Sequence, residues 1–230
     1  MSLSILIPAK NEKENLPIVL DKLISFLNFE LDYEIVVIKA DNDDSDKNLN
    51  FKEFNNLKII QQKTPGYGAA LKEGFATATK KYLCIFNADG SFDVKDIKKL
   101  YDKTNDGNDF IYCSRYRKDA GSEDDSIITF IGNKFFSFIG NFFFNLNISD
   151  ILFTYFLADT KKIKTLNLLS NDFGICVEIP IKMHMNNFNY TEISSYEYKR
   201  MYGKKNVNEF KDGLLILIKL IKLYLKKNDG

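Results

Sequence analysis

The chain has 230 residues, 45% of them hydrophobic, which is enough for one globular domain with a sizeable core. Its 32 basic and 31 acidic side chains leave a net charge of +1, so no nucleic-acid partner is expected. The three cysteines, Cys84, Cys113 and Cys176, lie far apart in apolar runs, which argues against a disulfide framework or a zinc site and indicates a reducing compartment.

Strand-like and helix-like patterns alternate along the first half of the chain. Short apolar runs typical of buried strands cover 3–7, 34–38, 57–60, 82–86 and 110–112, and helical patterns cover 15–27, 69–78 and 94–101. This alternation predicts an α/β protein with a mostly parallel sheet, helices on both faces and right-handed crossovers. After residue 120 the pattern changes to phenylalanine-rich helical segments, a short strand near 190–193 and a terminal helix from about residue 208.

Polar residues follow each predicted strand at its carboxyl end. They are Pro8 to Glu12, Asp41, Gly66 to Gly68, Asn87 to Asp89 and Ser114 to Tyr116. Because these ends share one edge of a parallel sheet, we expect the residues to converge on one crevice, where open α/β sheets bind ligands. Taken singly, Glu12 and Asp41 are also explained as a helix-start acid and a turn residue.

The turn from Asn87 to Ser91 is the most informative of these segments. Asp89 either holds a divalent metal or caps the helix that begins near Asp93. The glycine turn at 66–71 lacks the third glycine of a dinucleotide fingerprint, and the chain has no Gly-Lys-Ser/Thr phosphate loop. Dehydrogenases and nucleoside triphosphatases are therefore disfavoured, whereas carboxylates, a metal and an arginine suit transfer from a nucleotide-activated donor.

Seven segments in this order carry a resemblance to a known family: 3–15, 33–46, 66–75, 87–93, 114–116, 150–154 and 192–203. With them the chain resembles the family 2 glycosyltransferases of the GT-A fold, and within these the dolichol-phosphate mannosyltransferase-like branch. The resemblance implies a Rossmann-like three-layer α/β/α sandwich with a mostly parallel central sheet, formed by residues 1–205. Apart from the resemblance, the pattern of apolar residues and lysines predicts that residues 206–230 form an amphipathic helix packed on this domain or on a membrane surface.

The resemblance further implies a nucleotide site and a metal site. The predicted nucleotide-binding residues are Pro8, Ala9, Asn11, Glu12, Asp41, Gly68, Lys72 and Ala88. Asp89 matches the last acid of the family's Asp-x-Asp motif, which binds Mg²⁺ or Mn²⁺, while Asn87 replaces the first acid and Ser91 adds an oxygen. The second strand also departs from the family pattern, so Asp43 stays an alternative to Asp41.

The implied reaction is an inverting, in-line displacement that moves a sugar from a nucleotide diphosphate sugar to an acceptor. Arg115 resembles a residue near the donor diphosphate, and Arg200 with Lys204 or Lys205 resembles the basic group that meets phosphates in the phosphate-acceptor branch. These two arginines and Asp89 are therefore predicted to be catalytic. A polyprenyl (dolichyl or undecaprenyl) phosphate acceptor needs no base.

A sugar hydroxyl acceptor does need a base, and Glu178, in the apolar segment 173–185, is the candidate for it. A solvent-facing or helix-capping role is the alternative for this residue. Two other functions stay open. A nucleotide-sugar-binding pseudoenzyme is suggested by Asn87, and a nucleotidyltransferase shares the broad architecture.

Two unusual segments bear on the acceptor and on location. Residues 127–146 carry seven phenylalanines, but glycine and polar residues interrupt them, so no membrane-spanning helix is expected. Residues 214–225 are strongly apolar and are bordered by lysines on one helical side. We expect a cytoplasmic protein of cell-envelope glycan biosynthesis without a signal peptide, in peripheral contact with an anionic membrane face, the alternative being that both segments pack against the domain or a second subunit.

Overall fold

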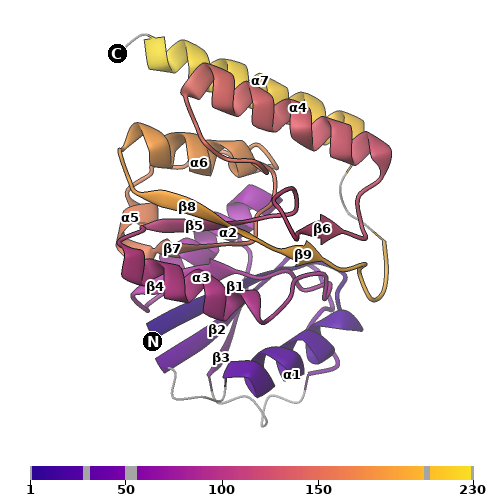
Figure 1. Ribbon diagram of the computed structural model, residues 1–230. Coiled ribbons are helices and arrows are strands. Elements are labelled where there is room, and N and C mark those ends of the chain that lie inside the picture. Colours follow the sequence, from indigo (N-terminus) through magenta and orange to yellow (C-terminus); the bar gives the residue numbers. More distant parts are fainter. Residues whose placement is uncertain (1, 28–31, 50–55, 205–207, 229–230) are drawn as a thin grey trace.

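A central sheet organises the structure, a computed structural model that describes residues 2–27, 32–49, 56–204 and 208–228 (Figure 1). In these segments the sheet has seven strands in the order β3-β2-β1-β4-β7-β5-β8. They are β1 (Ser2–Ala9), β2 (Asp32–Lys39), β3 (Leu57–Gln61), β4 (Tyr82–Ile85), β5 (Phe110–Ser114), β7 (Phe156–Asp159) and β8 (Tyr190–Ser194). A separate two-stranded parallel sheet pairs β6 (Gly121–Ser122) with β9 (Tyr196–Glu197).

The central strands are buried on both faces, as their uninterrupted apolar sequences require. β1 lies between β2 and β4, with Ile5 opposite Ile35 on one side and Cys84 on the other. Ile5 belongs to the hydrophobic cluster on one face of the sheet and Leu6 to the cluster on the opposite face. Strands of this kind need a layer of helices on each side.

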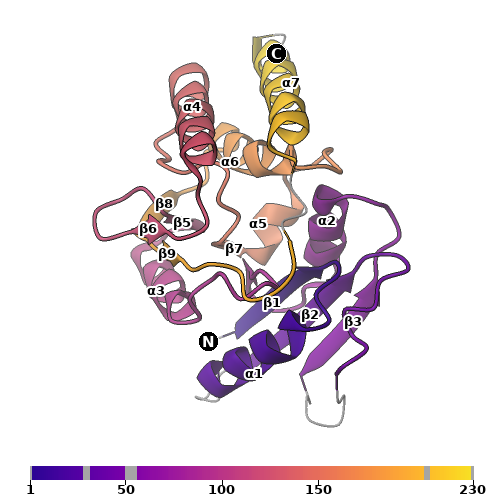
Figure 2. The ribbon, with the colours of Figure 1, turned by 90° about the vertical axis from the view of Figure 1, so that its right-hand side faces the viewer.

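Helices cover both faces and produce the predicted three layers. α1 (Asn15–Leu27) and α3 (Asp96–Asp102), which continues into the 3₁₀ turn η2 (Lys103–Asp106), contribute their apolar residues to one cluster. α2 (Tyr67–Thr77), α5 (Thr160–Lys164) and α6 (Ile175–Met185) contribute theirs to the other (Figure 2). The predicted α/β sandwich with a mostly parallel sheet is therefore confirmed.

Two long helices, α4 (Ile127–Phe144) and α7 (Glu209–Asn228), form an outer pair beyond α6 (Figures 1 and 2). Phe136 and Phe144 of α4, with Ile216, Leu220 and Leu223 of α7, join the core cluster. The other apolar side chains of the pair are largely exposed, for example Phe138 at 63% and Phe142 at 70%. The C-terminal helix thus packs on the domain through one side, while its predicted boundary at 205/206 lies outside the described residues.

By length and composition alone, α4 is long and apolar enough to cross a membrane, with a mean hydropathy of 1.4 and 17% of its residues buried. The prediction that no helix of the chain spans a membrane stays a prediction. The glycine and asparagine residues of α4 lower its mean hydropathy by less than its seven phenylalanines raise it.

β7 is a strand that the sequence pattern did not predict. Its four residues, Phe-Leu-Ala-Asp, are too few to show a period, and among the strands of the central sheet it alone runs antiparallel to its neighbours. Because β7 is antiparallel to both β4 and β5, those two strands remain parallel to each other. The carboxyl ends of β1 to β5 therefore share one edge, as predicted, and β7 begins at that edge.

Candidate active site

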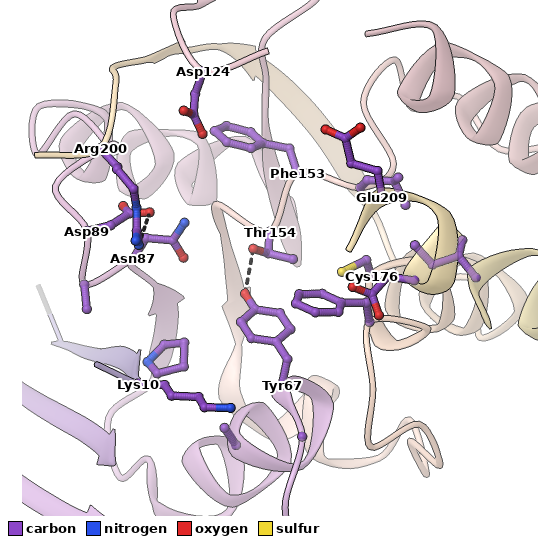
Figure 3. Close-up of a pocket in the computed structure, with 18 of the residues that line it drawn as sticks. Lys10, Tyr67, Asn87, Asp89, Asp124, Phe153, Thr154, Cys176, Arg200 and Glu209 are labelled. Carbon is purple, nitrogen blue, oxygen red and sulfur yellow. Dashed lines mark hydrogen bonds and ion pairs between the residues drawn. The ribbon is translucent and has the colours of Figure 1, made fainter. Parts of the chain in front are cut away.

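A cavity of about 800 Å³ opens at this edge of the sheet and extends beneath α4 and α7 (Figure 3). Residues at or just after the carboxyl ends of β1, β2 and β4 line one end, including Pro8, Glu12, Asp41 and Asp89. The other end is mostly apolar and is lined from α4, α6 and α7 by Ile128, Phe136, Cys176, Phe210 and Ile216. The cavity thus joins an acidic, strand-end region to an apolar, interhelical one.

Asp89 is held at the acidic end by its own turn. Gly90 reverses the chain with a φ of 79°, and Asp89 Oδ1 accepts hydrogen bonds from the Ser91 amide at 3.0 Å and the Ser91 hydroxyl at 2.7 Å. α3 begins at Asp96 without a side-chain cap, and in the turn before it the Asp93 carboxylate accepts from the Lys95 amide at 3.0 Å. The helix-cap alternative for Asp89 is therefore wrong, and its Oδ2 faces the cavity side.

Arg200 bridges the acids that follow β1 and β4. Its Nη2 donates to Glu12 Oε1 at 2.8 Å and to Asp89 Oδ2 at 3.4 Å (Figure 3). Glu12 is buried and also accepts from Asn15 Nδ2 at 2.6 Å. Burial raises the pKa of Glu12, although the hydrogen bond from Asn15 and the charge of Arg200 oppose the shift. One guanidinium thus neutralises part of the acidic end.

A backbone ladder brings Arg200 to this position from a distant part of the chain. The amide of Met201 donates to the Asp89 carbonyl at 3.0 Å, and the amide of Tyr198 donates to the Ser91 carbonyl at 2.9 Å. Beyond Arg200 the chain reaches Lys204, whose carbonyl accepts from the Arg200 guanidinium, whereas Lys205 lies outside the described residues. The segment after β9 therefore covers the Asp89 turn.

Arg115 is enclosed by carboxylates. Its Nε and Nη2 donate to Asp150 at 2.7 and 2.9 Å, and its Nη1 donates to Glu197 at 3.0 Å and to Asp125 at 3.4 Å. Burial alone would lower the pKa of the guanidinium, but Asp150 and Glu197 raise it well above the usual value. The guanidinium is lodged over the Phe153 ring at 4.5 Å. Arg115 therefore links the segments of the cavity wall, and its predicted place near the donor diphosphate stays a prediction.

A hydroxyl pair occupies the middle of the cavity. Tyr67 Oη and Thr154 Oγ1 are 2.8 Å apart, and Figure 3 shows them between the Asp89–Arg200 side and the Cys176–Glu209 side. Burial raises the pKa of Tyr67 well above its usual value, so the phenol stays protonated.

A family model described as glycosyl transferase family 2 matches residues 4–166, which is more than half of the chain. The chain belongs to this family.

Curated relatives of this family 2 chain include the dolichyl-phosphate enzymes that its sequence resembles. It is 32% identical over 112 residues to dolichyl-phosphate beta-glucosyltransferase of Dictyostelium discoideum and 31% identical over 127 residues to dolichol-phosphate mannosyltransferase of Pyrococcus furiosus. These matches cover 44% and 54% of this chain but only 34% and 36% of the relatives. Glycosyltransferase AglJ of Haloferax volcanii is 24% identical over 218 residues, covering 94% of this chain and 70% of that protein.

Solved structures show the same fold. Glucosyl-3-phosphoglycerate synthase from Mycobacterium tuberculosis, in complex with Mn²⁺, uridine diphosphate and phosphoglyceric acid, superposes with a TM-score of 0.75. The superposition covers 97% of this chain and 78% of that one, at 13% sequence identity. At this identity the likeness establishes the GT-A fold, as predicted from the sequence.

The cavity of this family 2 chain collects most of the residues predicted from the sequence. Those that line it are Pro8, Ala9, Glu12, Asp41, Asn87, Ala88, Asp89, Arg115 and Arg200. Asp43, the alternative to Asp41, instead accepts hydrogen bonds from the amides of Asn11 and Ser45. Its place in the cavity lining thus favours Asp41 over Asp43 as a nucleotide-binding residue. The roles of the individual lining residues stay predictions.

Four of the predicted binding residues do not line the cavity. Asn11 is exposed with a φ of 60°, and Gly68 packs against the backbone of 170–172. Lys72 donates to Asn171 Oδ1 at 2.6 Å, and the Ser91 hydroxyl donates to Asp89 Oδ1 at 2.7 Å. These side chains hold neighbouring segments in place, and their predicted roles in binding stay predictions.

Glu178 is the clearest correction. It lies fully buried in α6 outside the cavity lining, where its carboxylate accepts from the amides of Leu169 at 3.0 Å and Ser170 at 2.7 Å. It also forms ion pairs with Lys182 at 2.9 Å and Lys219 at 3.0 Å. A carboxylate bound to two lysines and two amides is a poor base, and here it fastens α7 and the 169–170 loop to α6.

Sequence reasoning missed Tyr67 and Thr154 as cavity residues. Both lie inside segments that carry the family resemblance, 66–75 and 150–154, so their location was indicated but their contact was not. Thr154 reaches the cavity because β7, an unpredicted strand, starts two residues later.

Proposed function

We propose that this chain is an inverting glycosyltransferase that moves a sugar from a nucleotide diphosphate sugar to a polyprenyl phosphate at a membrane surface. The observation that carries the proposal is a cavity that is acidic at Glu12, Asp41 and Asp89 and mostly apolar between α4 and α7. A polar donor and a lipid acceptor need such opposite surroundings. The relatives named for dolichyl phosphate support this acceptor class.

The acidic end suits a nucleotide diphosphate bound with Mg²⁺ or Mn²⁺. Asp89 and Asn87 offer the oxygen ligands that these ions prefer, and the described residues contain no cluster of three acidic, histidine or cysteine side chains that could hold an ion alone. The donor diphosphate would therefore complete the ligand set. A bound ion would neutralise charge on the leaving nucleoside diphosphate.

In this proposal the chain's own residues orient the reactants. Glu12 and Asp41 accept hydrogen bonds from the nucleoside, and Arg200 adds positive charge beside the diphosphate. The acceptor approaches from the side of α4 and α7 and attacks the anomeric carbon in line with the departing diphosphate. A phosphate acceptor is already ionised, so the loss of Glu178 as a candidate base leaves the mechanism intact.

The outer helix pair suits a membrane surface. Ile127, Ile131 and Phe138 on α4 are more than 60% exposed, and α7 exposes Leu214 and Leu225 to more than half. Lysines at the exposed positions 211, 222 and 226 of α7 add positive charge. An apolar face bordered by lysines binds the surface of an anionic bilayer. We propose a cytoplasmic location with peripheral contact on this basis.

A ligand screen followed by a transfer assay tests the function. UDP-, GDP- or CDP-sugars that bind the folded chain are expected to raise its melting temperature in the presence of Mn²⁺. The stabilising sugar nucleotide should then transfer its sugar to dolichyl or undecaprenyl phosphate in vesicles. Asp89→Ala should abolish this transfer without unfolding the chain, whereas Asp102→Ala, at an exposed position of α3, should leave the transfer unchanged. Binding without turnover would instead support a pseudoenzyme.

Co-sedimentation with vesicles tests the membrane contact separately. At low salt the chain is expected to sediment with anionic vesicles, and Phe138→Ser with Phe142→Ser should weaken the binding. Failure of the unaltered chain to bind anionic vesicles would refute the membrane proposal.

A sugar hydroxyl is the second candidate acceptor. Glu209 and Asp212 of α7 add two acidic side chains to the otherwise apolar end of the cavity, and the guanidinium of Arg115 is already bound by carboxylates. Such surroundings favour a neutral acceptor whose proton a carboxylate removes. Transfer to glycolipid hydroxyls but not to polyprenyl phosphates would favour this candidate.

A further inference from the structure

We propose that the hydroxyl pair of Tyr67 and Thr154 binds the sugar that is transferred and contributes to its selection. This inference rests on the proposed function, because it assumes a nucleotide diphosphate sugar in the cavity.

The hydroxyl pair lies between the two ends of the cavity. Tyr67 and Thr154 both line the cavity, and Figure 3 shows their hydroxyls between Asp89 and Arg200 on one side and Cys176 and Glu209 on the other. If the diphosphate lies beside Asp89 and the acceptor lies between α4 and α7, the sugar must occupy the space between them. The hydroxyl pair borders that space.

The hydroxyl pair can form further hydrogen bonds with a ligand. The two hydroxyls are 2.8 Å apart and share one hydrogen bond, which uses one of their two protons. The pair therefore keeps one proton to donate and several lone pairs to accept. A sugar hydroxyl, which both donates and accepts, matches this set. A site that hydrogen-bonds a substrate hydroxyl discriminates strongly against analogues that lack it.

The ring of Tyr67 is held rigidly by its neighbours. The Tyr67 ring stacks on Phe173 with centroids 5.0 Å apart and an angle of 19° between the planes. Tyr67 is the first residue of α2, directly after Gly66, whose φ of 116° suits glycine. A Cβ at Gly66 would lie 2.1 Å from the Asn171 carbonyl oxygen, so the chain is closely confined there. A ring held in this way needs little reorganisation when it binds a ligand.

The protonation state of the phenol fits this role. Burial raises the pKa of Tyr67, which keeps the hydroxyl a donor over the whole range of physiological pH. Tyr67 would therefore bind the sugar by hydrogen bonds rather than act as a base.

Two conservative variants test the inference. Tyr67→Phe and Thr154→Val each remove one hydroxyl and keep the shape of the side chain. Tyr190→Phe is the matched control, because its hydroxyl bonds the Asn147 amide at 3.1 Å, and Tyr190 does not line the cavity. Each variant is assayed with UDP-glucose and GDP-mannose for transfer, and with UDP and GDP plus Mn²⁺ for binding.

Tyr67→Phe is expected to lower kcat/KM about 3- to 10-fold, which corresponds to one neutral hydrogen bond, while the affinity for the free nucleoside diphosphate stays within about twofold. Thr154→Val should lower kcat/KM by a similar factor. The double variant should lower kcat/KM by less than the product of the two single-variant factors. With a donor whose deoxy sugar lacks the hydroxyl that Tyr67 binds, Tyr67→Phe should not lower kcat/KM any further.

The outcomes separate the two proposals. Equal kcat/KM for Tyr67→Phe, Tyr190→Phe and the unaltered chain would overturn the sugar contact and leave the proposed function standing. A parallel loss of free nucleoside diphosphate binding in Tyr67→Phe would also overturn it, because the residue would then act on the nucleotide half. If the unaltered chain neither binds a nucleoside diphosphate nor transfers a sugar, the proposed function itself fails.

Discussion

Replacing Glu178 with glutamine is expected to destabilise the fold and to leave the chemistry of the folded protein unchanged. The carboxylate is fully buried and is paired with Lys182 and Lys219. Burial alone would raise the pKa of Glu178, but hydrogen bonds from Lys182, Ser170 and Lys219 lower it from 4.5 to about 2. At about 1.4 kcal/mol per pKa unit, such a drop stabilises the folded state by about 3 kcal/mol.

The pH dependence has a definite sign. Because the folded-state pKa lies below the unfolded value of 4.5, the stabilisation is complete above pH 4.5 and is lost as the pH falls towards about 2. For a domain of this size, a loss of about 3 kcal/mol lowers the melting temperature by roughly 6–12 °C. The difference between Glu178→Gln and the unaltered chain should therefore be full at pH 7 and shrink as the pH falls below 4.5.

Urea unfolding at pH 7 and at acidic pH measures this effect, with Glu73→Gln as the control. The Glu73 carboxylate accepts hydrogen bonds from the amides of Lys63 and Thr64 at the surface, so its replacement should cost less than about 1 kcal/mol. If Glu178→Gln were as stable as the unaltered chain and had lost transfer activity, the ion-pair reasoning would be refuted and a catalytic base restored.

Two further predictions concern the cavity wall. Gly90→Ala should destabilise the chain by about 2 kcal/mol, because Gly90 has a φ of 79° and a Cβ there would meet Met201 Cε at 2.3 Å. Gly107→Ala is the control, because Gly107 has the same φ of 79° but a Cβ there would have no neighbour within 4 Å, so only the backbone strain remains. If thermal unfolding shows that both variants lose the same stability, the predicted clash with Met201 is contradicted. Asp150→Asn should cost about 3 kcal/mol, because it leaves the buried guanidinium of Arg115 short of a partner. Denaturant midpoints within error of the unaltered chain would show that the remaining carboxylates suffice.

The sequence indicated much of the fold because its signals are local. An apolar run such as 34–38 predicts a buried strand, and the spacing of apolar residues in 15–27 predicts an amphipathic helix, without knowledge of any partner. Their alternation implies parallel strands, and parallel strands place Glu12, Asp41 and Asp89 at one edge. The family, the sheet and the location of the acidic end of the cavity therefore followed from the amino-acid sequence by itself.

Tertiary structure decided which partner each charged side chain meets. Arg115 and Arg200 were alike as sequence candidates, yet Arg115 is surrounded by carboxylates from distant segments, whereas Arg200 is brought to Asp89 by a backbone ladder. Glu178 was chosen because an acid in an apolar segment is unusual, but Lys219, from a helix that begins 31 residues later, helps to neutralise it. Burial and charge pairing depend on contacts between remote segments, and no local pattern encodes those contacts.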